Sequence, residues 1–455
     1  MLEANRHPNI RTMTYAEVVG FSGFVGNFTV KIRQKARFVT NTCNGCGACV
    51  DICPAFRPHD FEYGMAESKA IYKAFAQAVP GIVQIDKNYC IECGLCKTVC
   101  ELDSIDLEQQ DEFIEEDFGV IVVACGFEEY EPSKGTLGYK EFPNVVTQGR
   151  LERILAPNGP TVGHLLRPSD GKRPRRIAMI QCVGSRDTRT NEHCCSVGCL
   201  LSVKNAKLIK QHYPDSEIYI IYMDMRCTGK ASEEYAMMTR MEGVHFIRSN
   251  IGRVWEDPET RNLILRFEDT MDPGKLKKLE VDMVVLTANM VLGESGKELA
   301  SLLRLDHSPD GFLKEFHARL DPISTKVPGI FLAGTCQGPL NIAESISHAK
   351  GAASSAGKIL KKGKYEIELI KAVVEHPEHC SVCYRCVEAC PYDAISIDDE
   401  GKINIDLVLC RGCGTCNNVC RSQTIQLRYY RDPGYEGYID GMLSSQEITD
   451  SGTKE

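Results

Sequence analysis

The chain has 455 residues, a length typical of about three domains. Its 53 basic and 62 acidic side chains give a net charge of −9 with no offsetting basic stripe, so we expect no nucleic-acid partner. No apolar run approaches the roughly 18 residues of a membrane-spanning helix. The N-terminus also lacks the apolar core of a secretion signal. These features predict a cytoplasmic globular protein with no membrane span.

Cysteine is the unusual component of the chain. There are 23 cysteines, and most of them fall into four copies of the spacing C-x2-C-x2-C-x3-C. Disulfide-rich secreted domains are normally much shorter, so metal ligation in a reducing compartment is the better interpretation. The four runs are Cys43, Cys46, Cys49, Cys53; Cys90, Cys93, Cys96, Cys100; Cys380, Cys383, Cys386, Cys390; and Cys410, Cys413, Cys416, Cys420.

The spacing of the runs is typical of [4Fe-4S] ligands. Three closely spaced thiolates bind one cube, and the fourth thiolate of each run binds the cube of the neighbouring run. Zinc is the alternative, but zinc ribbons use two well-separated C-x2-C pairs. The pattern resembles the bacterial two-cluster ferredoxin, present twice. The predicted ligand sets are Cys43, Cys46, Cys49 with Cys100; Cys90, Cys93, Cys96 with Cys53; Cys380, Cys383, Cys386 with Cys420; and Cys410, Cys413, Cys416 with Cys390.

The segments around the cysteine runs carry local structure signals. The stretch HDFEYGMAESKAIYKAFAQAV, residues 59–79, predicts a helix between the first two runs, and GIVQID, residues 81–86, predicts a short strand. The stretch AISIDDEGKINID, residues 394–406, predicts a hairpin before Cys410.

Five apolar runs lie between the two cysteine-rich ends of the chain. Because they are continuous and alternate with helical stretches, they predict a parallel sheet with helices on both faces, hence an α/β fold. The last run precedes a predicted helix over residues 341–360. The five runs are FGVIVVACGFEEY (118–130), PRRIAMIQCVG (174–184), EIYIIYMDMR (217–226), VDMVVLTANM (281–290) and GIFLAGTCQGP (329–339).

A fifth cysteine constellation comprises Cys182, Cys194, Cys195 and Cys199. Cys182 ends a predicted strand, and the stretch from Cys194 begins a predicted helix on which Cys195 and Cys199 share a face. A helix N-terminus favours an anionic group. The residues alone leave a fifth iron–sulfur cluster, a zinc ion, and buried or redox-active thiols all open.

The remaining cysteines and the central histidines are assigned no chemistry. Cys125, Cys227 and Cys336 are expected to be packed thiols. No acid–base pair calls for a catalytic role. The histidines considered for one, and expected to be packing or surface residues, are His164, His193 and His348.

Two strand ends, VACGF and FLAGTCQG, resemble the glycine-containing strand ends of two-dinucleotide-domain flavoproteins of the thioredoxin-reductase type. The resemblance implies FAD contacts at Gly126, Gly334, Thr335, Gln337 and Ile342. Thr335 stands where the family has an acidic residue. No G-x-G-x-x-G occurs anywhere in the chain, and a loop without those glycines cannot bring its backbone close to a pyrophosphate. We therefore expect no ordinary NAD(P) site.

The order of these features resembles the A subunit of heterodisulfide reductase over nearly the whole chain. The resemblance favours the cluster interpretation of the fifth constellation and implies FAD with electron bifurcation. It also implies partner subunits and a ferredoxin or a hydrogenase- or formate-dehydrogenase-type donor. That family carries an N-terminal FAD fingerprint that is not seen here. Either a partner chain bears that region and FAD is shared with it, or this member has lost part of its flavin site.

The resemblance predicts a division of the chain into seven parts. These are a β segment of the flavin domain (1–35), an inserted 2[4Fe-4S] ferredoxin domain (36–110), a flavin-domain part (111–171), a degenerate nucleotide-binding domain with the extra cysteines (172–290), the C-terminal part of the flavin domain (291–365), a second 2[4Fe-4S] ferredoxin domain (366–428) and a polar, peripheral tail (429–455).

Two other functions remain open at this point. The chain could be a non-catalytic iron–sulfur relay or scaffold in a related complex, such as an aromatic acyl-CoA reductase. It could also be a zinc-rich interaction protein, which iron analysis would distinguish.

Overall fold

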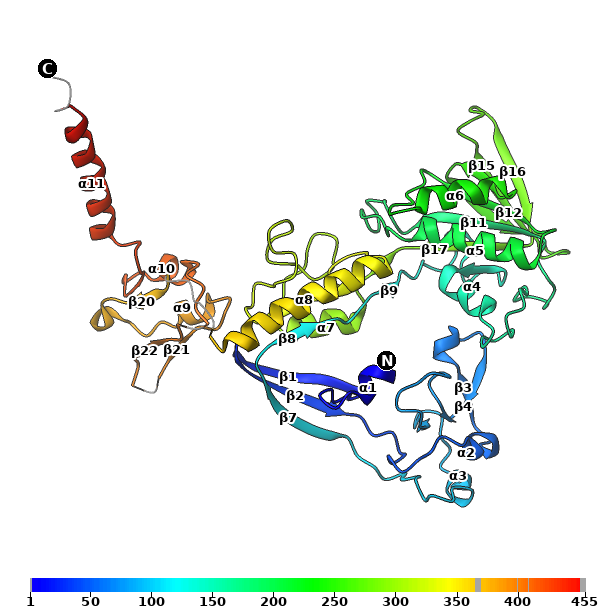
Figure 1. The fold of residues 1–455 in the computed structure, drawn as a ribbon, viewed down its shortest axis with the longest axis horizontal. Helices are drawn as coiled ribbons and strands as arrows, with labels where there is room; N and C mark the ends of the chain where they lie inside the picture. The colour runs from blue at the N-terminus through cyan, green and yellow to red at the C-terminus, as the bar shows by residue number, and fades with distance from the viewer. Residues whose placement is uncertain (1, 365–369, 399, 408, 451–455) are drawn as a thin grey trace. The chain divides into compact units, whose positions relative to one another are not determined.

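A computed structural model describes residues 2–364, 370–398, 400–407 and 409–450. The chain divides into two compact units, residues 1–22 with 28–357, and residues 358–455 with the turn 23–27. Figure 1 labels the helices and strands of both units. Among the described residues, no helix combines the length and the apolar character needed to cross a bilayer.

The chain begins with the short helix α1 (Leu2–Arg6), and a three-stranded antiparallel sheet follows. Strands β1 (Ala16–Phe24), β2 (Asn27–Gln34) and β7 (Glu112–Phe118) lie in that order. The β2–β7 register runs from Phe28 opposite Phe118 to Gln34 opposite Glu112. The ferredoxin-like insert therefore leaves and re-enters the sheet at neighbouring strand ends.

The insert holds two short helices, each ending near the fourth cysteine of its run. These are α2 (Ala48–Ile52) and α3 (Leu95–Thr98). Between them lie the antiparallel pair β3 (Phe56–Pro58) and β4 (Glu67–Lys69), the turn η1 (Asp60–Glu62), and the antiparallel pair β5 (Ile71–Tyr72) and β6 (Gln84–Ile85).

The helix predicted over residues 59–79 is wrong. Tyr63 and Gly64 both have positive φ, which ends any helical turn there and closes the β3–β4 hairpin. Ile71 and Ile85 pair across β5 and β6 and are buried among the cysteines of the insert. Tertiary packing thus overrides the helical propensity of the segment.

The centre of the chain is a five-stranded parallel sheet with the order β10-β17-β11-β12-β13. The predicted strands over 174–184, 217–226 and 281–290 are confirmed by three of its members. The strands are β10 (Val145–Thr147), β11 (Arg176–Val183), β12 (Glu217–Tyr222), β13 (His245–Arg248) and β17 (Met283–Ala288). Their continuous apolar stretches form a buried core.

Helices and a second sheet complete this domain (Figure 1). The helices are α4 (Gln148–Leu155), α5 (Gly198–His212) and α6 (Ser232–Met241). Strands β14 (Ile251–Glu256), β15 (Leu263–Glu268) and β16 (Leu276–Val281) form an antiparallel meander. The order β11-α5-β12-α6-β13 is that of a dinucleotide-binding half-domain.

A second parallel contact joins β8 (Ile121–Val123) to β19 (Ile330–Leu332). Strand β19 leads into the turn η3 (Gly334–Cys336) and the helix α8 (Ile342–Lys362), which confirms the predicted strand–turn–helix. Strands β9 (Glu128–Glu129) and β18 (Met290–Val291) form an antiparallel pair. The remaining elements of this region are the turn η2 (Thr136–Gly138), which contacts β14, and the helix α7 (Glu294–Leu302).

The second unit contains the other ferredoxin-like domain. Its helices are α9 (Arg385–Glu388) and α10 (Thr415–Val419). Strands β20 (Ala372–Val374) and β23 (Ile425–Leu427) pair with each other. The other two strands are β21 (Ile395–Ile397) and β22 (Ile403–Ile405). The β21–β22 pair confirms the hairpin predicted before Cys410. The turn η4 (Pro377–His379) precedes the third cysteine run.

The chain ends in a helix, α11 (Asp432–Asp450), where only a polar tail was expected. Apolar side chains recur along one stripe at helical spacing and are more than half exposed: Tyr435, Tyr438, Ile439, Met442 and Leu443. The tail, predicted to be polar and peripheral, is thus helical over Asp432–Asp450 and carries an exposed apolar stripe.

Candidate iron–sulfur and flavin sites

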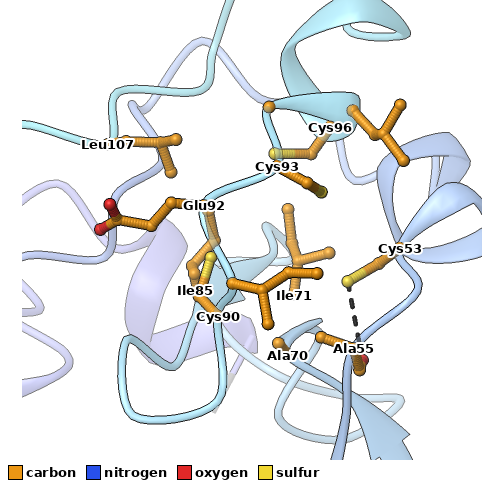
Figure 2. Close-up of a pocket in the computed structure, with 13 residues that line it drawn as sticks. Cys53, Ala55, Ala70, Ile71, Ile85, Cys90, Glu92, Cys93, Cys96 and Leu107 are labelled. Atoms are coloured by element: carbon orange, nitrogen blue, oxygen red, sulfur yellow. Dashed lines mark hydrogen bonds between the residues drawn. The ribbon is translucent and has the colours of Figure 1, made fainter.

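Two cavities bring a run of three cysteines together with the fourth cysteine of the neighbouring run. In the first, Cys90, Cys93 and Cys96 share a cavity with Cys53, which comes from the other loop (Figure 2). In the second, Cys410, Cys413 and Cys416 share a cavity with Cys390. Both cavities are otherwise lined mainly by apolar side chains, as a buried cluster requires.

The other two sets are also neighbours. Burial, followed by the charges of Cys43, Cys46 and Cys100, raises the pKa of Cys49 to about 11. Burial likewise raises the pKa of Cys386, and Cys420 and Cys383 add to the shift. These mutual effects place the cysteines of each set close to one another, as ligands of one metal cluster must be.

The four cysteine loops share one backbone conformation. The residue after the second cysteine of each run is left-handed and caps a helix: Gly47, Gly94, Tyr384 and Gly414. The residue before the second cysteine is left-handed as well: Gly45, Glu92, Val382 and Gly412. This repeated turn directs successive thiols and N–H groups towards one centre, as a nest for an anionic group does.

Backbone N–H groups donate to several of the cysteine sulfurs. Gly45 N donates to Cys43 Sγ at 3.3 Å, Ser104 N to Cys100 Sγ at 3.3 Å, and Ala394 N to Cys390 Sγ at 3.3 Å. Hydrogen bonds of this kind to cysteine sulfurs are among the features that tune iron–sulfur clusters. The chemistry of the four sets therefore fits [4Fe-4S] clusters.

The fifth constellation lies where β11 leads into α5. Cys182 sits at a bulge in the β11–β17 register and has a φ of 60°. Cys195 is buried, and Cys199 is buried in the first turn of α5. The helix begins at Gly198 rather than before Cys195, because Ser196 is left-handed. The prediction that Cys195 shares a helix face with Cys199 is therefore wrong, although the two thiols remain neighbours.

Two guanidinium groups flank this constellation. Arg186 hydrogen-bonds to the Cys182 thiol and ion-pairs with Asp224. The hydrogen bond from the Cys195 thiol lowers the pKa of Cys194 to about 5, and Arg226 adds to the shift. Positive charge beside clustered thiols suits an anionic metal–thiolate centre. The two arginines, Arg186 and Arg226, were missed by the sequence analysis, because only the fold brings them to the thiols.

The strand ends proposed to contact flavin form two glycine turns. Gly126 follows β8 with a φ of 78°, and Gly334 follows β19 with a φ of 75°. The N–H of Gly334 donates to His348 Nδ1 at 3.0 Å, and His348 Nε2 lies 3.2 Å from the carbonyl of Pro322. His348 thus holds this turn in place, a positioning role in keeping with the expected packing histidine.

The N-terminus of α8 follows the second glycine turn. Asn341 and Glu344 form a reciprocal capping pair, with N–H to side-chain oxygen distances of 2.9 Å each way. Ile342 at the first helical position is largely exposed. The N–H groups of a first turn have no partner within their helix and attract phosphate groups. Thr335 and Gln337 lie between Gly334 and this helix and are half-buried.

The three unassigned cysteines differ in exposure. Cys336 is fully buried, and Cys227 is half-buried. Cys125 is exposed, so the expectation of a packed thiol is wrong at that position. The reason is that β8 ends at Val123, two residues earlier than a continuous strand would.

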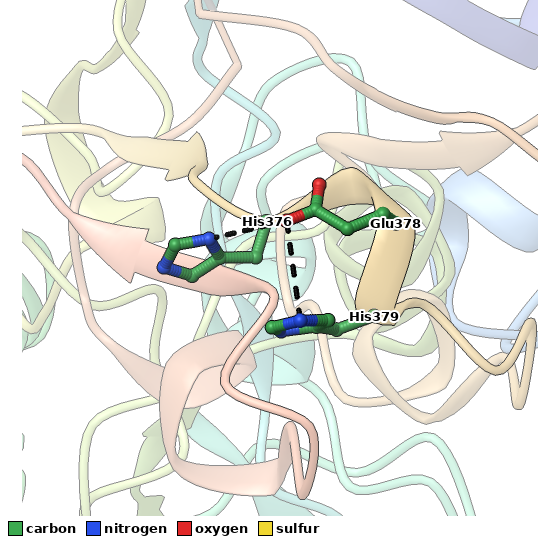
Figure 3. A group of neighbouring side chains, drawn as sticks. All are labelled: His376, Glu378 and His379. Atoms are coloured by element: carbon green, nitrogen blue, oxygen red, sulfur yellow. Dashed lines mark ion pairs between the residues drawn. The ribbon is translucent and has the colours of Figure 1, made fainter.

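His376, Glu378 and His379 form a surface group on and beside η4 (Figure 3). Glu378 Oε1 lies 3.4 Å from His376 Nδ1 and 3.9 Å from His379 Nε2. All three side chains are exposed. Water therefore competes with each contact, and this exposure favours separately hydrated side chains over a built metal site.

Comparison with known proteins identifies the cysteine-rich ends of the chain. A 4Fe-4S dicluster domain model matches residues 39–104, and a second 4Fe-4S dicluster domain model matches residues 379–424. The fold and these matches define an iron–sulfur oxidoreductase component in which an α/β region lies between two dicluster domains in the sequence.

Sequence similarity to curated proteins identifies the family within this class of iron–sulfur oxidoreductases. The chain is 45% identical to the iron–sulfur A subunit of CoB–CoM heterodisulfide reductase from Methanocaldococcus jannaschii, over 99% of this chain and 69% of that protein. It is 45% identical to an A subunit of the same reductase from Methanopyrus kandleri, over 98% of this chain and 68% of that protein. It is 42% identical to the A subunit of H2:CoB-CoM heterodisulfide,ferredoxin reductase from Methanothermobacter thermautotrophicus, over 98% of this chain and 68% of that protein.

The chain belongs to the family of heterodisulfide reductase A subunits, as the resemblance predicted. A solved structure, LpdA from Mycobacterium tuberculosis, aligns with a TM-score of 0.38 and 12% identity over 80% of this chain and 53% of that one.

Proposed function

We propose that this chain carries electrons through five [4Fe-4S] clusters, that it contributes to a flavin site, and that it splits electron pairs within a heterodisulfide-reductase-like complex. One observation carries the proposal. The fifth constellation occupies the β11–α5 connection, which is the phosphate-binding turn of an ordinary dinucleotide domain. Cysteines there, between two dicluster domains, favour electron transfer over nucleotide binding.

The proposed cluster ligands are the four crossed sets and the fifth constellation. Support for the crossed sets comes from the shared cavities and from the mutual charge effects described above. For the fifth set, Cys182, Cys194 and Cys199 influence one another electrostatically, and Cys195 hydrogen-bonds to Cys194. The helix α5 begins one residue before Cys199 and adds its positive end.

FAD, when bound, accepts an electron pair and releases the electrons singly to acceptors of different potential. Residues of this chain would hold it at the glycine turns: Gly126, Gly334, Thr335, Gln337 and Ile342. His348 would fix the second turn by accepting the N–H of Gly334. The N–H groups at the start of α8 would face the phosphates.

The FAD fingerprint is not among these residues, so we propose that another segment, of this protein or of a partner chain, completes the flavin site. The proposed partners are the other subunits of a heterodisulfide-reductase-like complex. A ferredoxin or a hydrogenase- or formate-dehydrogenase-type module would supply or take electrons. The reducing conditions that keep thiolates available for iron favour a cytoplasmic complex.

Iron and flavin analysis of the native complex tests this proposal. Five cubes predict about 20 irons per chain with little zinc, from four irons in each cube. Replacing Cys182 by Ser should remove one cluster, about four irons, and leave the other clusters intact. Zinc in place of iron, or 16 irons in the unaltered chain, would contradict the five-cluster proposal.

A second candidate function is an iron–sulfur relay or scaffold in a related complex, such as an aromatic acyl-CoA reductase. The N–H of Gly334, one of the groups proposed to face flavin, is already bonded to His348, which favours a retained scaffold. Absence of FAD from the native complex would support this function. Tight, stoichiometric FAD on the isolated chain would instead contradict a site shared with a partner.

A further inference from the structure

Two thiols outside the proposed cluster sets meet at the ends of neighbouring strands. Strands β8 and β19 are parallel, with Val123 opposite Leu332, and the N–H of Ala333 donates to the Val123 carbonyl at 2.9 Å. Cys125 follows β8 by two residues. Cys336 lies at the end of the η3 turn that follows β19. The chain therefore brings both thiols to one edge of this strand pair.

The turn η3 directs the Cys336 side chain back towards β8. Cys336 Sγ lies 3.3 Å from the carbonyl of Val123 and 3.4 Å from the carbonyl of Ala333. Val123 is only two residues before Cys125, and the two thiols hydrogen-bond to each other.

The two thiols differ in the way that the members of a dithiol exchange site differ. Cys125 is exposed, whereas Cys336 is fully buried. The hydrogen bond from the Cys336 thiol lowers the pKa of Cys125 to about 7, and the same contact raises the pKa of Cys336. The accessible thiol is thus the more acidic of the two, and the inaccessible thiol holds its proton more firmly.

We propose that Cys125 and Cys336 form a reversible thiol–disulfide exchange site that accepts small disulfides, with Cys125 as the attacking sulfur and Cys336 as the resolving sulfur. The proposal does not require bound flavin and is separate from the cluster assignments.

The exchange is balanced by the disulfide that it consumes. The Cys125 thiolate attacks RS–SR, which forms the Cys125–SR mixed disulfide and releases one thiolate, RS⁻. Cys336 then loses its proton and attacks Cys125 Sγ, which forms the Cys125–Cys336 disulfide and releases the second RS⁻; the proton goes to solvent or to that leaving group. Two electrons pass from the cysteine pair to the small disulfide.

The test uses the native complex with its clusters intact, kept free of oxygen and incubated with glutathione disulfide. After an acid quench, alkylation and trypsin digestion, we expect peptide 327–350, which contains only Cys336, to be joined to peptide 98–134. Fragmentation should place the link at Cys125 rather than at Cys100. Absence of the linked pair, or a stable glutathione adduct on Cys125 of the unaltered chain, would overturn the proposal.

Single substitutions test the separate roles of the two sulfurs. In Cys336→Ser, glutathione should remain attached to Cys125, because no second thiol resolves the adduct. In Cys125→Ser, the buried Cys336 should stay unmodified. Cys227→Ser is the matched control, since Cys227 is a half-buried thiol outside the site, and this variant should form the link as the unaltered chain does. A resolved adduct in Cys336→Ser would contradict the proposed roles.

Alkylation rates give a second readout that does not need an oxidant. The rate at Cys125 should rise with pH with a midpoint near 7. Loss of the Cys336 hydrogen bond should return Cys125 towards an ordinary pKa of about 8.5, and slow alkylation at pH 7 by about threefold, since the smaller thiolate fraction is partly offset by greater nucleophilicity. A midpoint near the ordinary value in the unaltered chain would overturn the proposal even if the variant did not fold.

Discussion

Gly45 and Gly412 occupy the same position in two cysteine loops and have the same reason to be glycine. Their φ values are 72° and 66°. A Cβ at Gly45 would lie 2.2 Å from the carbonyl oxygen of Gly81, and a Cβ at Gly412 would lie 2.2 Å from that of Ile370. Each glycine therefore allows its loop to pack directly against a neighbouring backbone.

We predict that Gly45→Ala removes iron from the first ferredoxin domain, because both the φ and the contact are unfavourable. Gly47→Ala is the matched control: its φ is 93°, but a Cβ there meets nothing within 4 Å. It should cost only the strain of the left-handed backbone, about 1–3 kcal/mol. Iron content per purified chain is the measurement. Equal iron loss in both variants would show that the contact with Gly81 is unimportant.

His348 holds the glycine turn that follows β19. Its Nδ1 accepts the N–H of Gly334, and its Nε2 faces the Pro322 carbonyl. We predict that His348→Ala lowers the free energy of unfolding by about 1–3 kcal/mol, since it leaves a partly buried N–H without its acceptor. Denaturant unfolding measures this change. His212→Ala, at an exposed position, should change stability by less than about 0.5 kcal/mol, and an equal effect of the two would contradict the positioning role.

Among the elements, α4 joins the first ferredoxin domain to the centre of the chain. Arg153 on α4 donates to both carboxylate oxygens of Glu62, at 2.9 and 2.7 Å, and both side chains are at least 85% buried. The guanidinium also lies 4.6 Å from the ring centroid of Phe61. This bidentate, stacked arrangement is specific to arginine.

We predict that Arg153→Ala destabilises the domain contact by about 3–5 kcal/mol, because it leaves the Glu62 carboxylate buried without its partner. Hydrogen exchange of residues 59–72 should accelerate. Glu152, also on α4, pairs with Lys204 at an exposed position, so Glu152→Ala should cost about 0–1 kcal/mol. Unchanged exchange in Arg153→Ala would show that other contacts hold the domain.

Across the molecule, the cores of the two ferredoxin domains differ in kind from the core of the parallel sheet. In each ferredoxin domain, several cysteines belong to the apolar cluster, either as buried residues or as partly buried residues packed against it. The buried residues of the sheet core include no cysteine and are mainly aliphatic. Iron binding should therefore contribute to the folding free energy of the ferredoxin domains but not to that of the parallel sheet.

We predict that removal of iron with a chelator unfolds the two ferredoxin domains and leaves the parallel sheet folded. Amides in residues 39–104 and 372–427 should lose protection from hydrogen exchange, whereas those of β11, β12 and β17 should keep it. Simultaneous loss of protection in the sheet would show instead that the domains unfold as one cooperative unit.

The chemistry of the cysteine runs and most of the regular elements can be predicted from the amino-acid order alone. Cysteine spacing indicates that the first three thiols of a run bind one cube, since only two residues separate each from the next. The fourth thiol of the run binds the cube of the neighbouring run. The buried strands were predictable because both faces of a parallel sheet are covered, which makes their sequences continuously apolar.

Features that depend on distant partners could be seen only in the folded chain. The segment 59–79 has helical propensity, but pairing of Ile71 with Ile85 makes part of it a strand. Arg186 and Arg226 reach the fifth constellation only through the fold. The Cys125–Cys336 contact joins positions 211 residues apart. No local pattern encodes such meetings, because side chains far apart in sequence become neighbours only when strands pair and helices pack.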